Sequence, residues 1–345
     1  MASKTGTGNF FEDFRVGATF VHATPRTLTE GDVALNVALY GSRFAVNSSS
    51  LFASRIGLPD APIDDVFVFN VVFGKTVPDI SLNAIANLGY AEGTFGVPVY
   101  PGDTISATST VIGLKENSNR KTGIVYVRTA GANQNGEPVL DYVRWVMVRK
   151  KDEAVAAPAE TVPALKDAVL PEDIRVPGGL DLTDYDCALS GSAARWDDYE
   201  KGERIDHVDG MTIEEAEHTM ATRLYQNTAR VHFNLHAEKD GRFGRRIVYG
   251  GHVIALARAI SFNGLQNAFR VAAINGGRHV NPTFAGDTIH AWTEVLDKAP
   301  CPGRADVGLL RLRTMATKDK TCADFPGGAD PATVLDFDYW ALLPR

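Results

Sequence analysis

The chain has 345 residues, of which 44% are apolar and 22% are charged. This composition is that of a globular protein with a sizeable core, so it excludes a disordered chain and a small disulfide scaffold. The 35 Lys and Arg against 42 Asp and Glu give a formal net charge of -7, opposite to the basic surface that binds phosphate backbones. We therefore expect no nucleic-acid partner.

The N-terminal residues and the cysteines bear on the cellular compartment. Residues 1–9 lack the apolar core of a signal peptide, and no stretch approaches the roughly 18 apolar residues of a membrane span. The three cysteines have no Cys-x-x-Cys spacing, which argues against a disulfide framework and a cysteine-based zinc site. We expect a cytoplasmic protein with reduced thiols and no membrane partner.

In the first half of the chain, a polar and turn-rich segment precedes one unusually apolar stretch at 66–76, which predicts a helix. This stretch has no polar face, so the helix should be buried all round. Alternating patterns then predict three strands, at 104–114, 123–130 and 138–149. The short Gly, Asn and Asp turns between them favour an antiparallel meander.

The composition changes after Lys150. Residues 151–177 are rich in Ala, Pro and acidic residues and contain no aromatic residue, which is typical of a linker. The second half then repeats the pattern of the first, with an apolar helical stretch at 251–262 and three predicted strands, at 287–296, 305–317 and 334–343. We assign a first domain to residues 1–150, a linker to 151–180 and a second domain to 181–345.

The two halves can be laid over each other with a shift of about 185 residues. This shift places the segment 11–17 on 196–202 and Tyr40 on Tyr225, and a shift of 184 places 101–105 on 285–289. Near the end of each half, residues 142–145 resemble residues 337–340. Matches in one order indicate two diverged copies of one α+β domain, each with an antiparallel sheet around one buried helix. Two such sheets can join edges into one continuous sheet.

The common nucleotide-binding and nucleophile motifs are absent from the sequence. There is no G-x-G-x-x-G after a strand, no Walker loop, no G-x-S-x-G and no H-E-x-x-H, which disfavours Rossmann enzymes, NTPases and α/β-hydrolases. His232 and His236 have the spacing of two metal ligands on a helix, but no third ligand is suitably placed. We expect neither a metal nor a cofactor.

The segments 225–234 and 241–252 carry the most informative pattern. Here the chain resembles the MaoC-like, (R)-specific enoyl-CoA hydratases of the hot dog fold, in which an Asp and a His five positions apart form the catalytic dyad. Asn227 stands at the position of that Asp and His232 at the position of that His. In the first copy the matching residues are Ser42 and Asn47, so the resemblance implies a double hot dog protein with chemistry in its second half.

Adding water to the carbon β to a thioester requires a proton carrier, an orienting partner and donors for the enolate oxygen. We assign the first role to His232 and the second to Asn227, whose amide would hold the water or fix the His tautomer. The backbone N–H of Gly250 or Gly251 would face the thioester oxygen. The predicted substrate contacts also include three side chains, Arg230, Arg246 and Tyr249. Asp64 and Asp65 are the alternative source of a carboxylate.

Longer runs of sequence are similar to the mesaconyl-CoA hydratase family, also described as β-methylmalyl-CoA dehydratases. They are the segments 9–15, 22–34, 40–44, 72–79 and 99–105. The resemblance implies hydration of mesaconyl-CoA to β-methylmalyl-CoA in an ethylmalonyl-CoA type of pathway, with a CoA thioester as the partner molecule. Another enoyl-CoA or itaconyl/fumaryl-type hydratase, or a non-catalytic acyl-CoA or acyl-ACP binding module, are the alternatives. A homodimer remains open.

Overall fold

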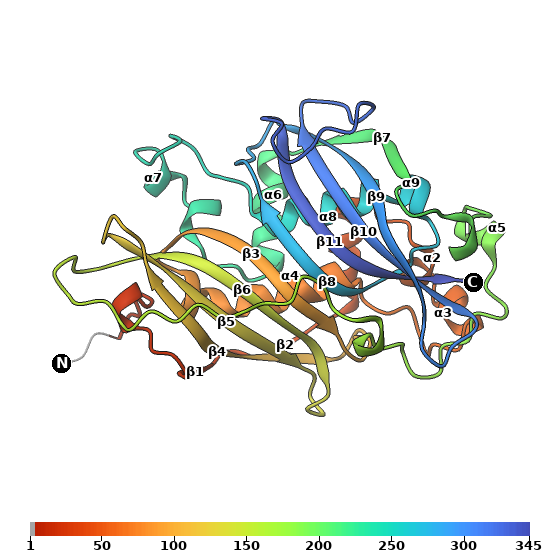
Figure 1. The fold of residues 1–345 in the computed structure, drawn as a ribbon, viewed down its shortest axis with the longest axis horizontal. Coiled ribbons are helices and arrows are strands. Elements are labelled where there is room, and N and C mark those ends of the chain that lie inside the picture. Colours follow the sequence, from red (N-terminus) through yellow and green to blue (C-terminus); the bar gives the residue numbers. More distant parts are fainter. Residues whose placement is uncertain (1–3) are drawn as a thin grey trace.

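The computed structural model describes residues 4–345 and contains one continuous 11-stranded sheet. Its strands follow the order β1-β4-β5-β6-β3-β8-β11-β10-β9-β7, and β2 pairs with β4 outside this path (Figure 1). The strands are β1 Thr19–Val21, β2 Arg26–Thr27, β3 Ala84–Phe95, β4 Thr104–Glu116, β5 Thr122–Ala132, β6 Pro138–Arg149, β7 Arg204–Thr212, β8 Arg270–His279, β9 Thr288–Pro300, β10 Val307–Lys318 and β11 Thr333–Pro344.

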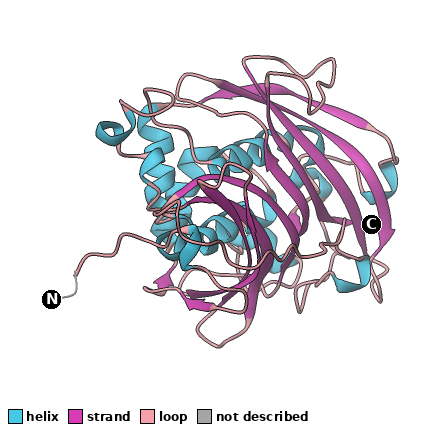
Figure 2. Ribbon diagram, turned by 60° about the vertical axis from the view of Figure 1, so that its left-hand side comes forward, coloured by secondary structure: helices cyan, strands magenta, loops and turns pink. Residues whose placement is uncertain are grey.

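The helices gather inside the curve of this sheet (Figure 2). The α-helices are α1 Glu30–Tyr40, α2 Ala45–Ser48, α3 Ser50–Arg55, α4 Asp65–Thr76, α5 Cys187–Ser190, α6 Glu215–Leu224, α7 Leu235–Glu238, α8 Gly250–Ile260 and α9 Phe262–Leu265. Short 3-10 or π turns are η1 Phe11–Asp13, η2 Val77–Ser81, η3 Pro171–Asp173, η4 Trp196–Asp198 and η5 Arg230–His232. Among the described residues no helix is long and apolar enough to cross a membrane.

The predicted central helices and meanders are confirmed. Helix α4 matches the stretch at 66–76, every residue of which is buried, and α8, at Gly250–Ile260, begins one residue before and ends two residues before the stretch predicted at 251–262. The six predicted strands correspond to β4, β5, β6, β9, β10 and β11, all antiparallel to their neighbours. In each half the sheet wraps one apolar helix, as expected for a double hot dog protein. Both helices contribute side chains to one hydrophobic core.

The polar, turn-rich first third of each half also contains a helix that the sequence analysis did not predict. These segments contain the 11-residue helix α1 and the 10-residue helix α6. Helix α1 begins at a capping box in which the Thr29 side chain accepts from the Asp32 amide and Asp32 accepts from the Thr29 amide. Helices α1 and α6 mix polar and apolar residues, as suits helices that pack on the central helices α4 and α8 with one face. Composition alone does not distinguish such helices from loops.

Strands β3 and β8 join the two half sheets, and the sequence reading missed both. Their register pairs Tyr90 with Gly277 and Gly93 with Ile274. Both strands are rich in Ala and Gly, which have low β-propensity. The small residues are needed for close approach, because a Cβ at Gly277 would lie 2.8 Å from the Tyr90 ring. The predicted joining of the two sheets along their edges is confirmed.

Pseudo-equivalent residues of the two halves meet inside the molecule. The hydroxyls of Tyr40 and Tyr225 share a hydrogen bond of 2.6 Å, and the Tyr40 hydroxyl also bonds to Nδ1 of buried His252 (2.9 Å). The side chains of His22 and His207, again 185 residues apart, each bond through Nε2 to a hydroxyl of their own half. The overlay made on the sequence therefore corresponds to a pseudo-two-fold arrangement of the chain.

Residues 151–180 follow an extended course across the outer face of the sheet. Thr161 forms a β-bridge with Leu114 of β4. Further along, the backbone of Val169 accepts from Trp340 Nε1 (3.0 Å) and donates to the side chain of Asn275 (2.9 Å). This predicted linker is thus attached to both half sheets. The domain boundaries assigned at its two ends stay a prediction.

Replacing Gly74 with Ala should reveal how closely the two halves approach. A Cβ at Gly74 of α4 would lie 1.9 Å from the carbonyl oxygen of Tyr225, a backbone atom of the other half. We expect Gly74→Ala to lower the free energy of unfolding by about 1–3 kcal/mol, the usual cost of overpacking. Urea denaturation measures this change.

Exposed Gly31 of α1 provides the matched control. Its added Cβ would meet nothing closer than 3.5 Å, at the Thr29 hydroxyl. Gly31→Ala should leave stability unchanged or raise it by up to about 1 kcal/mol, because Ala loses less backbone entropy on folding. Equal effects of the two substitutions would show that the close contact at Gly74 carries no energetic weight.

Candidate active site

His232 ends the short turn η5, between α6 and α8. Its Nδ1 lies 2.9 Å from the carbonyl oxygen of Ile247. A carbonyl oxygen only accepts, so Nδ1 carries the proton and donates, and the lone pair of a neutral imidazole is then on Nε2. This backbone hydrogen bond sets the tautomer that a general base needs, and it leaves Nε2 to act.

Burial is the main cause that lowers the pKa of His232, to about 4. The hydrogen bond to Ile247 works in the opposite direction, and the neighbouring His218 adds to the lowering. The imidazole is therefore neutral at physiological pH, and its unprotonated Nε2 can accept a proton. A neutral base in a partly desolvated site is the arrangement required for removing a proton from water.

Asn227 is buried at the start of the same loop. The side-chain Oδ1 of Asn227 accepts from the backbone N–H of Ala229 (2.9 Å). The backbone N–H of Asn227 donates to the carbonyl of Thr222 (3.0 Å). The side chain thus shapes the turn that carries His232, while Ile247 rather than Asn227 fixes the His tautomer. Nδ2 of Asn227 remains for water, so the water-holding role stays a prediction.

The first copy preserves the geometry of this loop without its base. Nδ2 of Asn47 donates to the carbonyl of Pro62 at 2.9 Å, and both residues lie 185 positions before His232 and Ile247. Asn47 therefore makes the hydrogen bond that His232 makes, but an amide does not titrate near neutral pH. The buried Ser42 hydroxyl, at the position of Asn227, has no hydrogen-bond partner among residues 4–345.

The two glycines at the start of α8 have no space for side chains. A Cβ at Gly250 would lie 2.3 Å from the imidazole of His279, and a Cβ at Gly251 would lie 1.9 Å from Oδ1 of Asn70. Tyr249, the N-cap residue, provides no side-chain hydrogen bond to the first turn. The first-turn amides of α8 are therefore not capped by a side chain. They are compatible with the predicted binding of the thioester oxygen, since a helix N-terminus favours negative charge.

His279 and Tyr90 belong to the site, and the sequence analysis missed both. The Tyr90 hydroxyl lies 3.1 Å from Nε2 of His279, across the junction of β3 and β8. Burial lowers the pKa of His279 to about 4, and the neighbouring charge of His232 contributes to that shift. No motif contains either residue, so only the pairing of the half sheets identifies them.

The predicted substrate contacts lie at different depths. The ring centre of Tyr249 is 5.5 Å from that of His232 and 5.5 Å from that of Phe73, so Tyr249 contacts both halves. Arg246 is paired with Glu215 and donates to the Thr219 hydroxyl. Arg230 is exposed on η5. The substrate roles of these side chains, and those of Gly250 and Gly251, stay predictions.

The two candidate carboxylates lie beside the loop of the first copy. Oδ1 of Asp64 caps α4 by accepting from Val66 and Phe67 at 2.9 and 3.2 Å. Burial raises the pKa of Asp65 to about 6, against the opposing charge of Arg270, whose Nη2 is 3.7 Å from Asp65. These carboxylates are part of the half that lacks the histidine.

Comparison with known proteins assigns the chain to a family. Residues 2–330 match the family model described as mesaconyl-CoA hydratase. The chain belongs to the mesaconyl-CoA hydratase family. It is 65% identical to a β-methylmalyl-CoA dehydratase of Chloroflexus aurantiacus, with 100% of this chain and 99% of that protein covered. A mesaconyl-CoA hydratase of Cereibacter sphaeroides is 58% identical, with coverage of 99% and 100%.

Solved structures support the same assignment. A MaoC-domain dehydratase of Chloroflexus aurantiacus superposes with a TM-score of 0.98 at 65% identity, over 100% of this chain and 99% of that one. A Mycobacterium tuberculosis protein with a double hotdog fold gives 0.78 at 25% identity, over 98% and 99%. The fold class is therefore a double hot dog. Membership in a hydratase family also identifies the chain as a hydro-lyase, which excludes the non-catalytic binding module.

The protonation state of His232 can be read directly by long-range ¹H–¹⁵N NMR of labelled histidines. We expect a neutral Nδ1–H tautomer down to about pH 5 and protonation near pH 4. His232→Gln identifies the resonance. A His232 that titrates near 6.5, or that carries its proton on Nε2, would contradict the geometry described above.

The same shift implies a loss of stability in acid. The unfolded imidazole takes up a proton near pH 6.5, whereas the folded one does so only near pH 4, so the unfolded state binds more protons between these values. His232 therefore stabilises the fold above pH 6.5, and this contribution is lost as the pH falls toward 4. Urea denaturation of wild type and His232→Gln should show a smaller acid-induced loss in the variant.

Proposed function

We propose that this chain catalyses the reversible addition of water to mesaconyl-CoA, which is 2-methylfumaryl-CoA, to give β-methylmalyl-CoA. The family assignment supports the substrate. The observation that carries the chemistry is the hydrogen bond from His232 to the carbonyl of Ile247, since it leaves a neutral Nε2 free as a base. The reaction needs no electron transfer, because water adds across an existing carbon–carbon double bond.

In the hydration direction, His232 Nε2 accepts a proton from water while the water oxygen bonds to the β carbon of the thioester. The π electrons move toward the α carbon and the thioester oxygen, which becomes enolate-like. The uncapped first-turn amides of α8, at Gly250 and Gly251, would stabilise that negative charge. The imidazolium then returns its proton to the α carbon, so the base is regenerated and one water is consumed.

Asn227 would orient the attacking water through Nδ2, since its Oδ1 is held by Ala229. The site then has one titratable side chain, His232, whereas the broader family has a histidine and an aspartate. The substrate itself carries a free carboxylate on the β carbon. A neutral amide at position 227 therefore avoids placing two negative charges around the reacting carbon.

A direct assay tests the proposal. Purified protein with no added metal should lower the absorbance of the enoyl-thioester band of mesaconyl-CoA, and β-methylmalyl-CoA should appear in equal amount. Another enoyl-CoA hydrated much faster than mesaconyl-CoA would reassign the substrate. Binding of the thioester without turnover would overturn the proposal.

Substituting the two pseudo-equivalent residues separates catalysis from structure. His232→Ala should reduce kcat by roughly 10² to 10⁴, the range for loss of acid–base assistance. Asn47→Ala removes the matching backbone hydrogen bond in the half without a base and should leave kcat within a few fold. Steady-state kinetics on mesaconyl-CoA give both values. A similar loss in the two variants would indicate that the hydrogen bond, and not the base, is what matters.

Asn227→Asp tests the role of the neutral amide. Restoring the carboxylate of the broader family should weaken binding of the dicarboxylic thioester by charge repulsion and improve relative use of crotonyl-CoA, which has no second carboxylate. Asn227→Ala provides the comparison, with a cost of about 1–3 kcal/mol for a lost orienting hydrogen bond. Higher activity of Asn227→Asp on mesaconyl-CoA, with unchanged preference, would exclude charge avoidance and direct attention to Asp64 and Asp65.

A further inference from the structure

Arg144 is a fully buried cation on β6, with an exposed fraction of 0%. Its Nη2 donates to the hydroxyls of Thr76 (2.7 Å) and Ser81 (3.3 Å). Nε and Nη1 have no hydrogen-bond partner among residues 4–345, although both are buried. A buried charge with unused donors is costly, because burial removes hydration that nothing in the protein replaces.

No acidic residue compensates this charge within the part of the chain that the structure describes. The titratable groups that act most strongly on the guanidinium are phenols, which are neutral near pH 7: Tyr142, Tyr90 and Tyr249. Buried His22 also interacts with it, as a second group that can carry positive charge. Asp79 on the neighbouring η2 segment is bonded to His22 instead, with Nδ1 and Oδ2 2.7 Å apart. Burial lowers the pKa of Arg144, but an arginine side chain stays protonated in proteins.

Arg144 lies one aromatic ring away from the candidate active site. Its guanidinium carbon is 4.2 Å from the centre of the Phe73 ring. Phe73 in turn contacts Tyr249, which contacts His232. The hydroxyl of Tyr249 is also buried without a hydrogen-bond partner among the described residues. The unused donors of Arg144 and Tyr249 therefore lie along one series of side-chain contacts that leads to His232.

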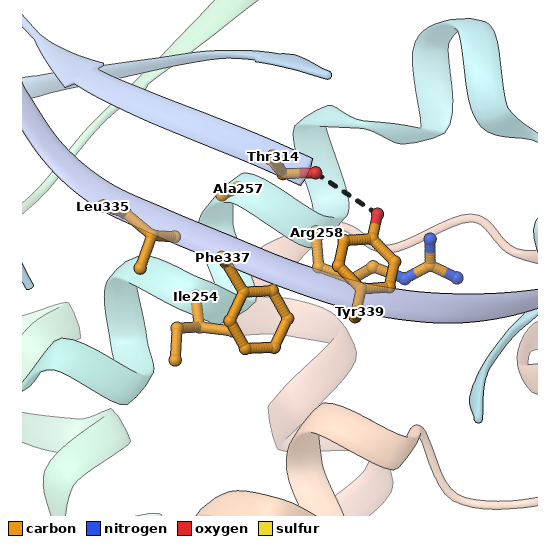
Figure 3. Close-up of a pocket in the computed structure, with 7 residues that line it drawn as sticks. All are labelled: Ile254, Ala257, Arg258, Thr314, Leu335, Phe337 and Tyr339. Atoms are coloured by element: carbon orange, nitrogen blue, oxygen red, sulfur yellow. Dashed lines mark hydrogen bonds between the residues drawn. The ribbon is translucent and has the colours of Figure 1, made fainter. Parts of the chain in front are cut away.

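The other half contains a rearranged version of this cluster. The sequence overlay places Tyr339 at the position of Arg144, and Arg258 of α8 at the position of Phe73. Figure 3 shows Arg258 and Tyr339 lining one small pocket, where the Tyr339 hydroxyl accepts from Thr314 (3.3 Å). In the second half the arginine thus comes from the helix and the aromatic ring from the strand.

The charges of the two clusters differ more than their shapes. Asp64 and Asp65 both act electrostatically on Arg258, so the protein supplies the acid there. The overlay places Tyr249 and Gly250 at the positions of these two aspartates. The cluster around Arg144 therefore has an arginine but lacks these carboxylates, so the described part of the chain supplies no matching negative charge there.

We infer that Arg144 binds the second carboxylate of a dicarboxylic acyl thioester and so determines substrate specificity. The inference rests on the proposed function, because mesaconyl-CoA carries such a carboxylate on the carbon that receives the hydroxyl group. Thr76 and Ser81 hold Nη2, and the N–H groups of Nε and Nη1 are left for the carboxylate. Charge-assisted hydrogen bonds of this kind are about twice as strong as neutral ones.

The test compares thioesters that differ in the carboxylate alone. Tigloyl-CoA, the (E)-2-methylbut-2-enoyl thioester, has a methyl group where mesaconyl-CoA has its carboxylate. In Arg144→Met, the ratio of kcat/KM for mesaconyl-CoA over tigloyl-CoA should fall by roughly 10²-fold or more, mainly through KM. Arg144→Lys keeps the charge without the planar donors and should recover part of that ratio.

Arg258→Met is the matched control, because it removes a buried arginine from the corresponding cluster of the other half. It should leave the ratio unchanged, whatever its effect on stability, which circular dichroism and thermal melting measure for each variant. A folded Arg144→Met that loses both thioesters equally would assign Arg144 a structural role and overturn the inference.

Binding of unreactive thioesters makes the test independent of turnover. Calorimetry on the wild type should show tighter binding of succinyl-CoA than of butyryl-CoA, and Arg144→Met should abolish that difference while Arg258→Met keeps it. If the wild type bound succinyl-CoA selectively through Arg144 but did not hydrate mesaconyl-CoA, the proposed function would fail and the inference would stand. If hydration occurred and the preference survived Arg144→Met, only the inference would fail.

Discussion

The pairing of β3 with β8 is the constraint on which the site depends. This pairing joins the sheet of the first half to the sheet of the second half. Tyr90 and His279 meet across the junction, and Phe73 of α4 contacts Tyr249 at the start of α8. Neither half contains the complete cluster, so the site exists only when the two half sheets are joined.

Duplication explains why the halves are so alike in backbone and so different in chemistry. The backbone hydrogen bond that holds His232 has a counterpart at Asn47, made to a carbonyl in the same place. An amide satisfies that geometry as well as an imidazole does, but it has no accessible proton equilibrium. One copy therefore preserves the scaffold while the other also carries the candidate base, and the two together form a single asymmetric candidate site.

Burial tunes both functional groups that the structure brings together. For His232, loss of water disfavours the charged form and keeps Nε2 available as an acceptor. For Arg144, loss of water leaves a charge without hydration and makes the cluster receptive to an anion. The same desolvation thus acts on the proposed base and on the proposed recognition group, since charges interact more strongly inside the protein than in water.

Gly74 and Gly251 show how close packing supports this arrangement. Each lies at a point where a backbone or side-chain oxygen of the other half would be closer than 2 Å to an added Cβ. Asn70 of α4 also donates to the carbonyl of Gly251 at 3.2 Å, which ties the two central helices at the start of α8. The position of the uncapped amides is therefore held by contacts from both halves.

The resemblance to the MaoC-like hydratases singled out His232 and Asn227, and the sequence by itself determined the duplication, the central helices and six of the strands. These features depend on local periodicity and on residue order, which a linear pattern contains. It also placed Gly250, Gly251 and Tyr249 at a helix start, because the motif and the apolar run are adjacent in the chain. The Ala- and Gly-rich junction strands escaped because their composition reflects close approach, not β-propensity.

Only the tertiary structure decided which distant residues share the site. Arg144 reads in the sequence as one more polar residue on an alternating strand, and nothing local distinguishes it from the exposed Arg230. Arg144 is buried and has unused donors because the two sheets enclose the helices. The same enclosure leaves it without a paired carboxylate among the described residues. Charge compensation is a property of three-dimensional neighbours, and the contacts that run from Arg144 through Phe73 and Tyr249 to His232 form only after the halves fold onto each other.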